Sequence, residues 1–264
     1  MRVLWGAVVA GAALAAASAS WGQTPTTTAG FAVPVEALKL GAAKTGFMES
    51  GASAGGRQML VKSYQSSVQG LIKSKTKFTN AFRFMTADGA VTLAGKCVFR
   101  AEGRSLLGID YTKTDARGYN CAAEAQAPEQ YAMEVALPSF GEARIGGALG
   151  LTISKDRSTS DVQSVLRSRM IYAGVAYEAK PTGFYTDSFM TRRVVQGYDI
   201  LRDGKLIGRL AYPKKEMTST KDQGDIIVPT SQADGRDAVL FMVMSLNAMP
   251  DVYAEQVRRE LSWN

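Results

Sequence analysis

The chain contains no histidine, and this decides which reactions its other residues are able to support. Ser-His-Asp and Cys-His catalysis, His-bound zinc and imidazole acid–base chemistry all require that residue. The groups left for catalysis are carboxylates, lysine, tyrosine and Ser–Lys pairs. The sequence therefore excludes the commonest hydrolase designs.

One serine lies in a pattern associated with nucleophilic catalysis. Gly51-Ala52-Ser53-Ala54-Gly55 matches Gly-X-Ser-X-Gly, the nucleophile elbow. That chemistry needs a strand before the serine, a helix after it and a histidine later in the chain. Residues 44–50 make a poor strand, and no histidine follows. Since Gly and Ala are abundant in this region, a chance match explains the pattern better than a catalytic Ser53.

Two further motifs are similar to those of the serine β-lactamase and penicillin-binding family. Ser74-Lys75-Thr76-Lys77 matches Ser-X-X-Lys, and Lys44-Thr45-Gly46 matches Lys-Thr-Gly. In that family Lys-Thr-Gly follows the nucleophile, whereas here it precedes the serine, and Ser-Asp-Asn is missing. Lys73, Lys75 and Lys77 alternate instead, which is typical of a solvated strand face. We therefore discount this chemistry.

Two charged stretches are candidate ligand sites. Asp222-Gln223-Gly224-Asp225 lacks the spacing of a calcium loop, so we interpret it as a solvated turn. A basic cluster falls on one predicted hairpin and its exit. Its members are Arg202, Lys205, Arg209, Lys214 and Lys215. Such a strand pair can bind phosphate or acidic sugar, but we favour an edge hairpin that charge protects against aggregation.

The first residues are typical of a secretory leader. Arg2 supplies a positive charge, Val3–Ala17 is a short apolar run, and Ala17-Ser18-Ala19 fits the cleavage rule. A transmembrane anchor is the alternative, but the run is short. We therefore expect a periplasmic or secreted protein without a transmembrane segment after cleavage. The predicted organisation is a signal peptide at 1–19, a flexible segment at 20–34 and a single β-rich domain at 35–264.

The formal charge of +7 falls to +6 when Arg2 is removed with the leader. This balance favours attraction to anionic surfaces such as lipid head groups, acidic glycans or nucleic acid. The export signal argues against nucleic acid, which we do not expect as a partner. A solvated basic surface without a specific partner is the alternative.

The two cysteines, Cys97 and Cys121, lie 24 positions apart. In an exported protein such a pair forms a structural disulfide, worth about 3 kcal/mol in the chain-entropy picture. A redox-active pair usually needs Cys-X-X-Cys spacing, which is absent. We predict that residues 112–128 form a long polar connection, which the disulfide would tie back to the strand holding Cys97.

Alternation with a period of two dominates the middle of the chain. Asp88-Gly89 and Asp203-Gly204 predict two hairpin turns, since Asp-Gly adopts the positive φ values of tight turns. Residues 59–72 are ambiguous between helix, strand and loop. The expected strands are 82–84, 91–99, 107–111, 131–137, 150–154, 170–179, 190–201, 206–212 and 226–228. Residues 35–40 are expected to form a short helix or strand, and 161–166 a short helix.

Near the C-terminus, Ala238–Met249 is apolar nearly all round, interrupted only by Ser245 and Asn247. At about 18 Å it is too short to cross a bilayer core of about 30 Å, so it predicts a buried core helix. A final amphipathic helix follows Pro250. The fold class is therefore mainly β (α+β): an antiparallel β-barrel or closed sandwich with a buried C-terminal helix and a terminal amphipathic helix.

Three stretches resemble the tubby-like and phospholipid-scramblase superfamily. Phe82–Val91 and Tyr198–Gly208 resemble its strand–Asp-Gly–strand units, and Asp237–Met249 resembles its buried helix. The resemblance spans residues 78–249 and implies a barrel of about twelve antiparallel strands around that helix, with an association with membrane lipids. The leader, the disulfide and the final helix depart from the pattern, and no binding residue is carried over.

These observations favour a non-enzymatic envelope protein that binds a lipid, an acidic glycan or a protein partner. We predict no catalytic residue, no metal and no cofactor. One alternative is a hydrolase or glycan-modifying enzyme that uses carboxylates such as Glu134 or Asp199. Another is a structural subunit of an envelope assembly.

Overall fold

The computed structural model describes residues 30–43, 49–69, 73–106, 109–114, 118–136, 139–140, 167–187, 192–211 and 224–248. These residues form fifteen strands and one helix. The strands are β1 (Val35–Lys39), β2 (Gly41–Ala42), β3 (Glu49–Ala54), β4 (Arg57–Gln69), β5 (Lys73–Thr86), β6 (Val91–Leu106), β7 (Ile109–Thr114), β8 (Gly118–Ala123), β9 (Tyr131–Ala136), β10 (Ser139–Phe140), β11 (Ser168–Tyr172), β12 (Val175–Asp187), β13 (Arg192–Arg202), β14 (Lys205–Ala211) and β15 (Asp225–Pro229). The helix is α2 (Arg236–Ala248).

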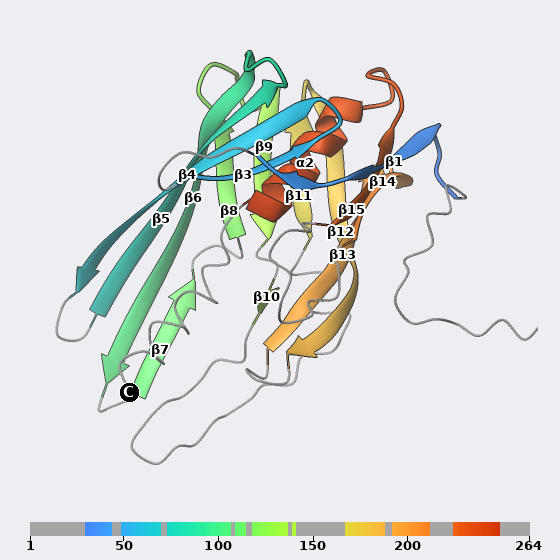
Figure 1. Cartoon of the computed structure of the whole chain (residues 1–264). Helices are drawn as coiled ribbons and strands as arrows, with labels where there is room; N and C mark the ends of the chain where they lie inside the picture. The colour runs from blue at the N-terminus through green and yellow to red at the C-terminus, as the bar shows by residue number, and fades with distance from the viewer. Residues whose placement is uncertain are drawn as a thin grey trace, which may run out of the picture.

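The strands form a single antiparallel sheet that curls into a nearly closed barrel (Figure 1). Along the sheet the order is β1-β15-β14-β13-β12-β11-β9-β8-β6-β5-β4-β3-β2, with β10 beside β13 and β7 beside β6. Neighbours along the chain are mostly neighbours in the sheet, as expected for strands joined by short hairpins. The predicted mainly β fold with a C-terminal helix is therefore confirmed, and its closed form is a barrel.

One short segment joins the two ends of the sheet. β1 pairs with β15, and β2 pairs with β3 through Gly41–Ser53 and Ala42–Ala52. Only Leu40, which is buried, separates β1 from β2, and its N–H donates to the carbonyl of Gly224 at 3.0 Å. Because β1 and β2 lie at opposite ends of the strand order, this segment closes the barrel and protects two edges that would otherwise remain open.

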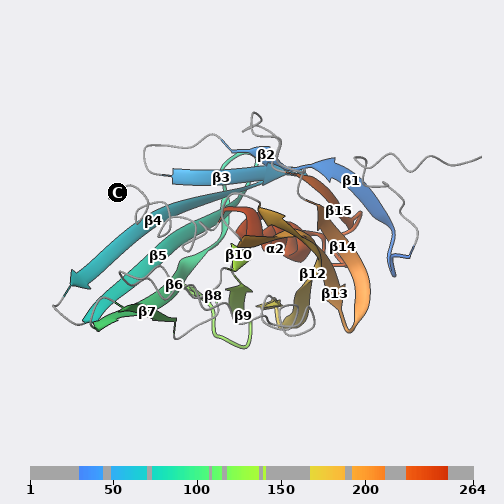
Figure 2. The ribbon, with the colours of Figure 1, turned by 90° about the horizontal axis from the view of Figure 1, so that it is seen from below.

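The predicted core helix is confirmed as α2, which the strands surround (Figures 1 and 2). Every residue from Ala238 to Leu246 is buried, as is Ala248. Phe241 lies at the centre, with its ring 5.2–5.9 Å from four aromatic rings of the barrel wall. Those rings belong to Phe82, Phe84, Tyr131 and Tyr172. A helix without a polar stripe has no solvent face, so the sheet must cover it on all sides.

The two Asp-Gly hairpins are confirmed. Residues 87–90 join β5 to β6, with Gly89 at a φ of 92°. Asp203 and Gly204 join β13 to β14, both with positive φ. A third tight turn, Ala173-Gly174, divides the stretch 170–179 that we expected as one strand into β11 and β12. The sequence concealed this turn because alanine seldom adopts a positive φ.

Several other expectations are refined. The ambiguous residues 59–72 belong largely to β4, a 13-residue strand, and residues 35–39 form a strand rather than a helix. The leader at 1–19, the strand expected at 150–154, the helix expected at 161–166 and the helix after Pro250 lie outside the described residues.

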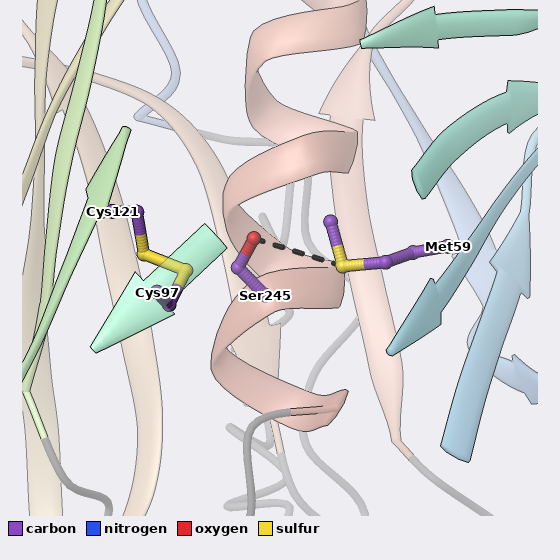
Figure 3. The surroundings of a disulfide bond; sticks show 4 residues. All are labelled: Met59, Cys97, Cys121 and Ser245. Atoms are coloured by element: carbon purple, nitrogen blue, oxygen red, sulfur yellow. Dashed lines mark hydrogen bonds between the residues drawn. A yellow bond between two sulfur atoms is a disulfide. The ribbon is translucent and has the colours of Figure 1, made fainter. Parts of the chain in front are cut away.

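The disulfide between Cys97 and Cys121 is present, but its expected setting was wrong (Figure 3). Residues 112–128 are not one long connection, since they include all of β8 and the end of β7. Cys97 in β6 and Cys121 in β8 are directly paired residues of adjacent strands, 3.9 Å apart at Cα. Both face the core, and the nearby Ser245 hydroxyl donates to the sulfur of Met59 at 3.7 Å. The bond therefore locks two barrel strands in register.

Replacing both cysteines with alanine (Cys97→Ala with Cys121→Ala) is expected to lower the free energy of unfolding by about 3 kcal/mol, because the unfolded chain regains loop entropy. Urea unfolding followed by circular dichroism measures the change. Ser245→Ala, which leaves the bond intact beside the same core residues, is the control. Equal midpoints for the oxidised protein and the double variant would contradict a stabilising role.

Candidate functional site

The predicted basic hairpin lies on β13 and β14, and two of its cations contact other groups of the chain. Arg209 donates from Nε to Asp199 at 2.6 Å and lies 5.8 Å above the Phe31 ring. Arg202 donates to the carbonyl of Ala233 at 3.4 Å. Lys205 is exposed, while Lys214 and Lys215 lie outside the described residues. Anion binding here stays a prediction, and the contacts of Arg202 and Arg209 are those of a stabilised hairpin.

A larger concentration of charge appears where the sheet places β4, β5 and β6 side by side. We call these three strands the basic ribbon. They contain nine basic residues and one acidic residue, a formal charge of +8. The basic residues are Arg57, Lys62, Lys73, Lys75, Lys77, Arg83, Lys96, Arg100 and Arg104, and the acidic residue is Glu102. Since the whole chain carries +7, the rest of it sums to −1.

The outer face of the ribbon presents part of this charge to solvent. Lys62, Lys77 and Arg83 are exposed, and they alternate along their strands with buried side chains such as Val61 and Phe82. Lys96 is also exposed. Arg83 reaches Glu49 at 3.4 Å, and Lys96 reaches Glu124 at 3.5 Å. Two carboxylates therefore meet four exposed cations, and the face keeps a net positive charge.

The ribbon also extends past the helix that it helps to enclose (Figure 1). A 13-residue helix is about 20 Å long, whereas the 14 residues of β5 span about 48 Å. Where β4 leaves the helix behind, three consecutive residues, Tyr64, Gln65 and Ser66, are all exposed. Successive residues of a strand point to opposite faces, so both faces of the sheet are open to solvent at this point.

The other side of the barrel carries charge of both signs in close pairs. Lys39 lies 2.5 Å from Asp225, and Arg209 lies 2.6 Å from Asp199. Glu178 lies between Arg169 and Lys180, at 4.0 and 3.8 Å. The positive field of the described residues is therefore concentrated on the basic ribbon.

Arg57 connects the ribbon to the first turn of α2. Its guanidinium makes a bidentate contact with Asp237, with Nε donating at 2.9 Å and Nη2 at 2.5 Å. Gln232 supports this pair, because its amide donates to Asp237 Oδ1 and its carbonyl oxygen accepts the Asp237 N–H. The Arg57 guanidinium also lies 5.9 Å above the Phe84 ring. The pair is largely buried, with side chains 17% and 18% exposed, and it sets the position of the helix in the barrel.

Tyr172 lies near this pair, and Tyr131 packs against Tyr172. Burial raises the pKa of Tyr172 to about 12, and the Asp237 carboxylate adds to the shift while Arg57 opposes it. Burial also raises the pKa of Tyr131, whose ring lies 6.5 Å from that of Tyr172. Both hydroxyls therefore remain neutral at physiological pH.

The candidate catalytic groups are not assembled into a site. Ser53 lies within β3, which continues through a tight turn into β4 rather than a helix, and its hydroxyl donates to the carbonyl of Ala42. Two strands separate Glu134 in β9 from Asp199 in β13, so these carboxylates do not form a pair. Among the residues that the structure describes, no cluster of Cys, Asp and Glu side chains is arranged to hold a metal ion.

Comparison with known proteins identifies no relative of this chain. No family model matches the chain, and no match was found among the curated proteins or the solved structures. Within the described ranges, no helix combines the length and apolar character needed to span a membrane. The resemblance to the tubby-like and scramblase superfamily accordingly stays a prediction.

Breaking the Arg57–Asp237 pair is expected to destabilise the barrel. Arg57→Met or Asp237→Leu alone should lower the free energy of unfolding by about 3 kcal/mol, because each leaves a buried charge without its partner. The double variant should lose less than the sum of the two, which a double-mutant cycle in urea would measure. Arg83→Met, at the exposed pair with Glu49, is the control and should cost less than about 1 kcal/mol. Additive losses would contradict direct coupling.

The raised pKa of Tyr172 predicts a loss of stability in alkali. The unfolded tyrosine has its ordinary pKa of about 10, so its neutral form favours the folded state fully below pH 10. That contribution is lost as the pH rises from 10 through about 12. Thermal melts between pH 8 and 12 should fall less steeply for Tyr172→Phe than for the wild type. Tyr64→Phe, the same change at an exposed position, should follow the wild type. Parallel curves for all three would show that Tyr172 does not contribute.

Proposed function

We propose that this chain is an exported, non-enzymatic envelope protein that binds phosphate- or carboxylate-bearing groups through the basic ribbon. The observation that carries this proposal is the charge of three adjacent strands, nine basic residues against one acidic. Basic side chains held in a row bind such groups through charge-assisted hydrogen bonds. Long-range attraction from the same face also raises the rate of encounter.

The proposed location rests on the leader and on the disulfide. Residues 1–19 have the composition of a signal peptide. Cys97 and Cys121 form a bond of the kind that persists in oxidising compartments such as the periplasm. Both features support export, and an exported basic protein meets lipid head groups and acidic glycans before it meets nucleic acid.

A binding role fits the arrangement of the described side chains better than catalysis does. Glu134 and Asp199, the carboxylates considered for catalysis, lie on separate strands, and Asp199 is paired with Arg209. An inverting glycosidase would need two carboxyl groups about 6.5–9.5 Å apart in a cleft. The exposed Lys62, Lys77 and Lys96, in contrast, lie on neighbouring strands of one face.

The barrel around an apolar helix also supports distant kinship with the tubby-like and scramblase superfamily. The support is architectural: a continuous antiparallel sheet, hairpins at Asp88-Gly89 and Asp203-Gly204, and α2 in the core. We propose this kinship on architecture alone, and it carries no ligand over to this chain.

Neutralising the outer face of the ribbon tests the proposal. The variant Lys62→Gln, Lys77→Gln and Lys96→Gln removes three charges, each worth about 1 kcal/mol near an anionic surface. We expect the affinity for phosphatidylglycerol-containing vesicles or immobilised polyuronate to fall on the order of 100-fold. Vesicle flotation and column retention at increasing salt are the measurements.

The matched control is Lys39→Gln, Arg169→Gln and Lys180→Gln, which removes the same charge from the other side of the barrel. It should retain at least half of the wild-type affinity, because these cations lie on β1, β11 and β12 and not on the basic ribbon. Equal losses in the two variants, or no binding of wild type to either probe at low salt, would overturn the proposal.

A further inference from the structure

The outer face of the basic ribbon carries one large, exposed aromatic side chain. Tyr64 on β4 is 51% exposed, and the ammonium of Lys62 lies 5.6 Å from the centre of its ring. Residues two apart on a strand share a face, and the cation–π contact holds these two side chains together. A positive charge and an exposed ring are therefore presented to solvent side by side.

The strand register extends Lys62 into a row that crosses the sheet. Lys62 pairs with Ala81 on β5, and Ala81 pairs with Lys96 on β6. Neighbouring strands lie about 4.8 Å apart, so the backbones of the two lysines are about 10 Å apart. The row therefore consists of two cations with a single methyl group between them.

A second row lies two residues away on each strand, at about 7 Å from the first. It runs from Tyr64 through Thr79 and Val98 to Asn120 on β8. Thr79 and Val98 are half-buried, and Asn120 is exposed. The hydroxyl and amide groups of this row are suited to exchange hydrogen bonds with a ligand rich in hydroxyl groups. On β9 the row ends at Glu134, which pairs with Asn120 and brings a negative charge.

The other acidic residues lie around this surface. Glu49 on β3 contacts Arg83 at 3.4 Å, and Glu124, just after β8, contacts Lys96 at 3.5 Å. Glu102 lies further along β6. β4, β5 and the part of β6 up to residue 99 contain no acidic residue. The three strands that carry most of both rows are therefore positive throughout this part.

A uronic acid combines the two features that Lys62 and Tyr64 complement. Its carboxylate accepts charge-assisted hydrogen bonds from an ammonium group. The C–H groups on one face of its pyranose ring pack against the electron-rich face of an aromatic ring. In an extended β-1,4-linked chain, alternate sugars present their carboxylates to the same side. The repeat of two sugars is close to the spacing of Lys62 and Lys96.

Other anionic ligands use only part of this surface. A phosphate head group pairs with the lysines through charge and gains nothing from the row of Thr79 and Asn120. A single-stranded nucleic acid also stacks on tyrosine. The leader at residues 1–19 and the Cys97–Cys121 bond support export, which argues against that partner. The two rows together therefore favour an acidic polysaccharide.

We propose that the outer face of the basic ribbon binds a polyuronate chain that crosses β4, β5, β6 and β8. Tyr64 stacks against one sugar, and Lys62 and Lys96 hold two of the carboxylates. Glu134 limits the site at β9 because it repels the next acidic sugar. This proposal rests on the proposed function, because it uses the same basic face, and it names the class of ligand.

Calorimetric titration with a short oligomer of β-1,4-linked mannuronic acid tests the stacking contact. Tyr64→Leu keeps an apolar side chain but removes the ring, and it should weaken binding about tenfold. Tyr64→Phe keeps the ring and should bind as the wild type does. The same oligomer with its carboxyl groups reduced to alcohols should show no binding. Equal affinities for wild type and Tyr64→Leu would refute the stacking contact.

A second variant tests the path of the chain across the strands. Ala81→Gln leaves the charge unchanged but places a longer side chain between Lys62 and Lys96, so it should lower the affinity for the oligomer. Ala132→Gln, the same change on β9 beyond the site, should bind as the wild type does. Circular dichroism melts verify that both variants fold. Equal affinities for the two variants would contradict the proposed path.

The same probes separate failure of this proposal from failure of the proposed function. The proposed function stands alone if the triple variant of Lys62, Lys77 and Lys96 loses binding to the oligomer but Tyr64→Leu does not. It also stands alone if the wild type binds phosphatidylglycerol vesicles or a single-stranded oligonucleotide at least as tightly as the oligomer. If the wild type binds none of these probes at low salt, both proposals fail.

Discussion

The need to bury a helix that is apolar on every side organises this structure. A helix with one apolar stripe is covered by a sheet or a helix pair, but α2 offers no face to water. The sheet therefore has to curl until it surrounds the helix, and the twist of antiparallel strands allows it to do so. Phe241, in contact with four aromatic rings of the wall, marks where this enclosure is tightest.

Additional contacts close the barrel and hold the helix where the regular strand pairing ends. Segment 35–42 pairs with β15 through β1 and with β3 through β2. It therefore joins the two ends of the sheet. The Arg57–Asp237 pair holds the start of α2, and the Ser50 hydroxyl donates to the carbonyl of Ala248 at its end. The helix is therefore held at both ends by polar contacts and along its length by apolar ones.

The basic ribbon is a consequence of strands that are longer than their core requires. Inside the barrel, every second side chain of these strands faces the core, and Val61, Phe82 and Phe84 are buried there. Beyond the helix the same strands have nothing to cover, which is why Tyr64, Gln65 and Ser66 are all exposed. A projecting sheet with open faces risks association with other sheets, and like charges oppose that association. The charge that protects the ribbon also suits it to an anionic surface.

The sequence by itself determined the local features. The apolar run after Ala238 identified the core helix, Asp203-Gly204 identified a hairpin, and alternation identified several of the strands, because each depends on residues close together in the chain. The disulfide partners could be predicted because the chain has two cysteines. Their position on directly paired strands could not, because the pairing of β6 with β8 depends on residues far apart in the chain. Only the tertiary structure placed β4, β5 and β6 side by side. Their charge therefore became one surface, whereas the sequence had pointed to the hairpin of Arg202 and Lys205.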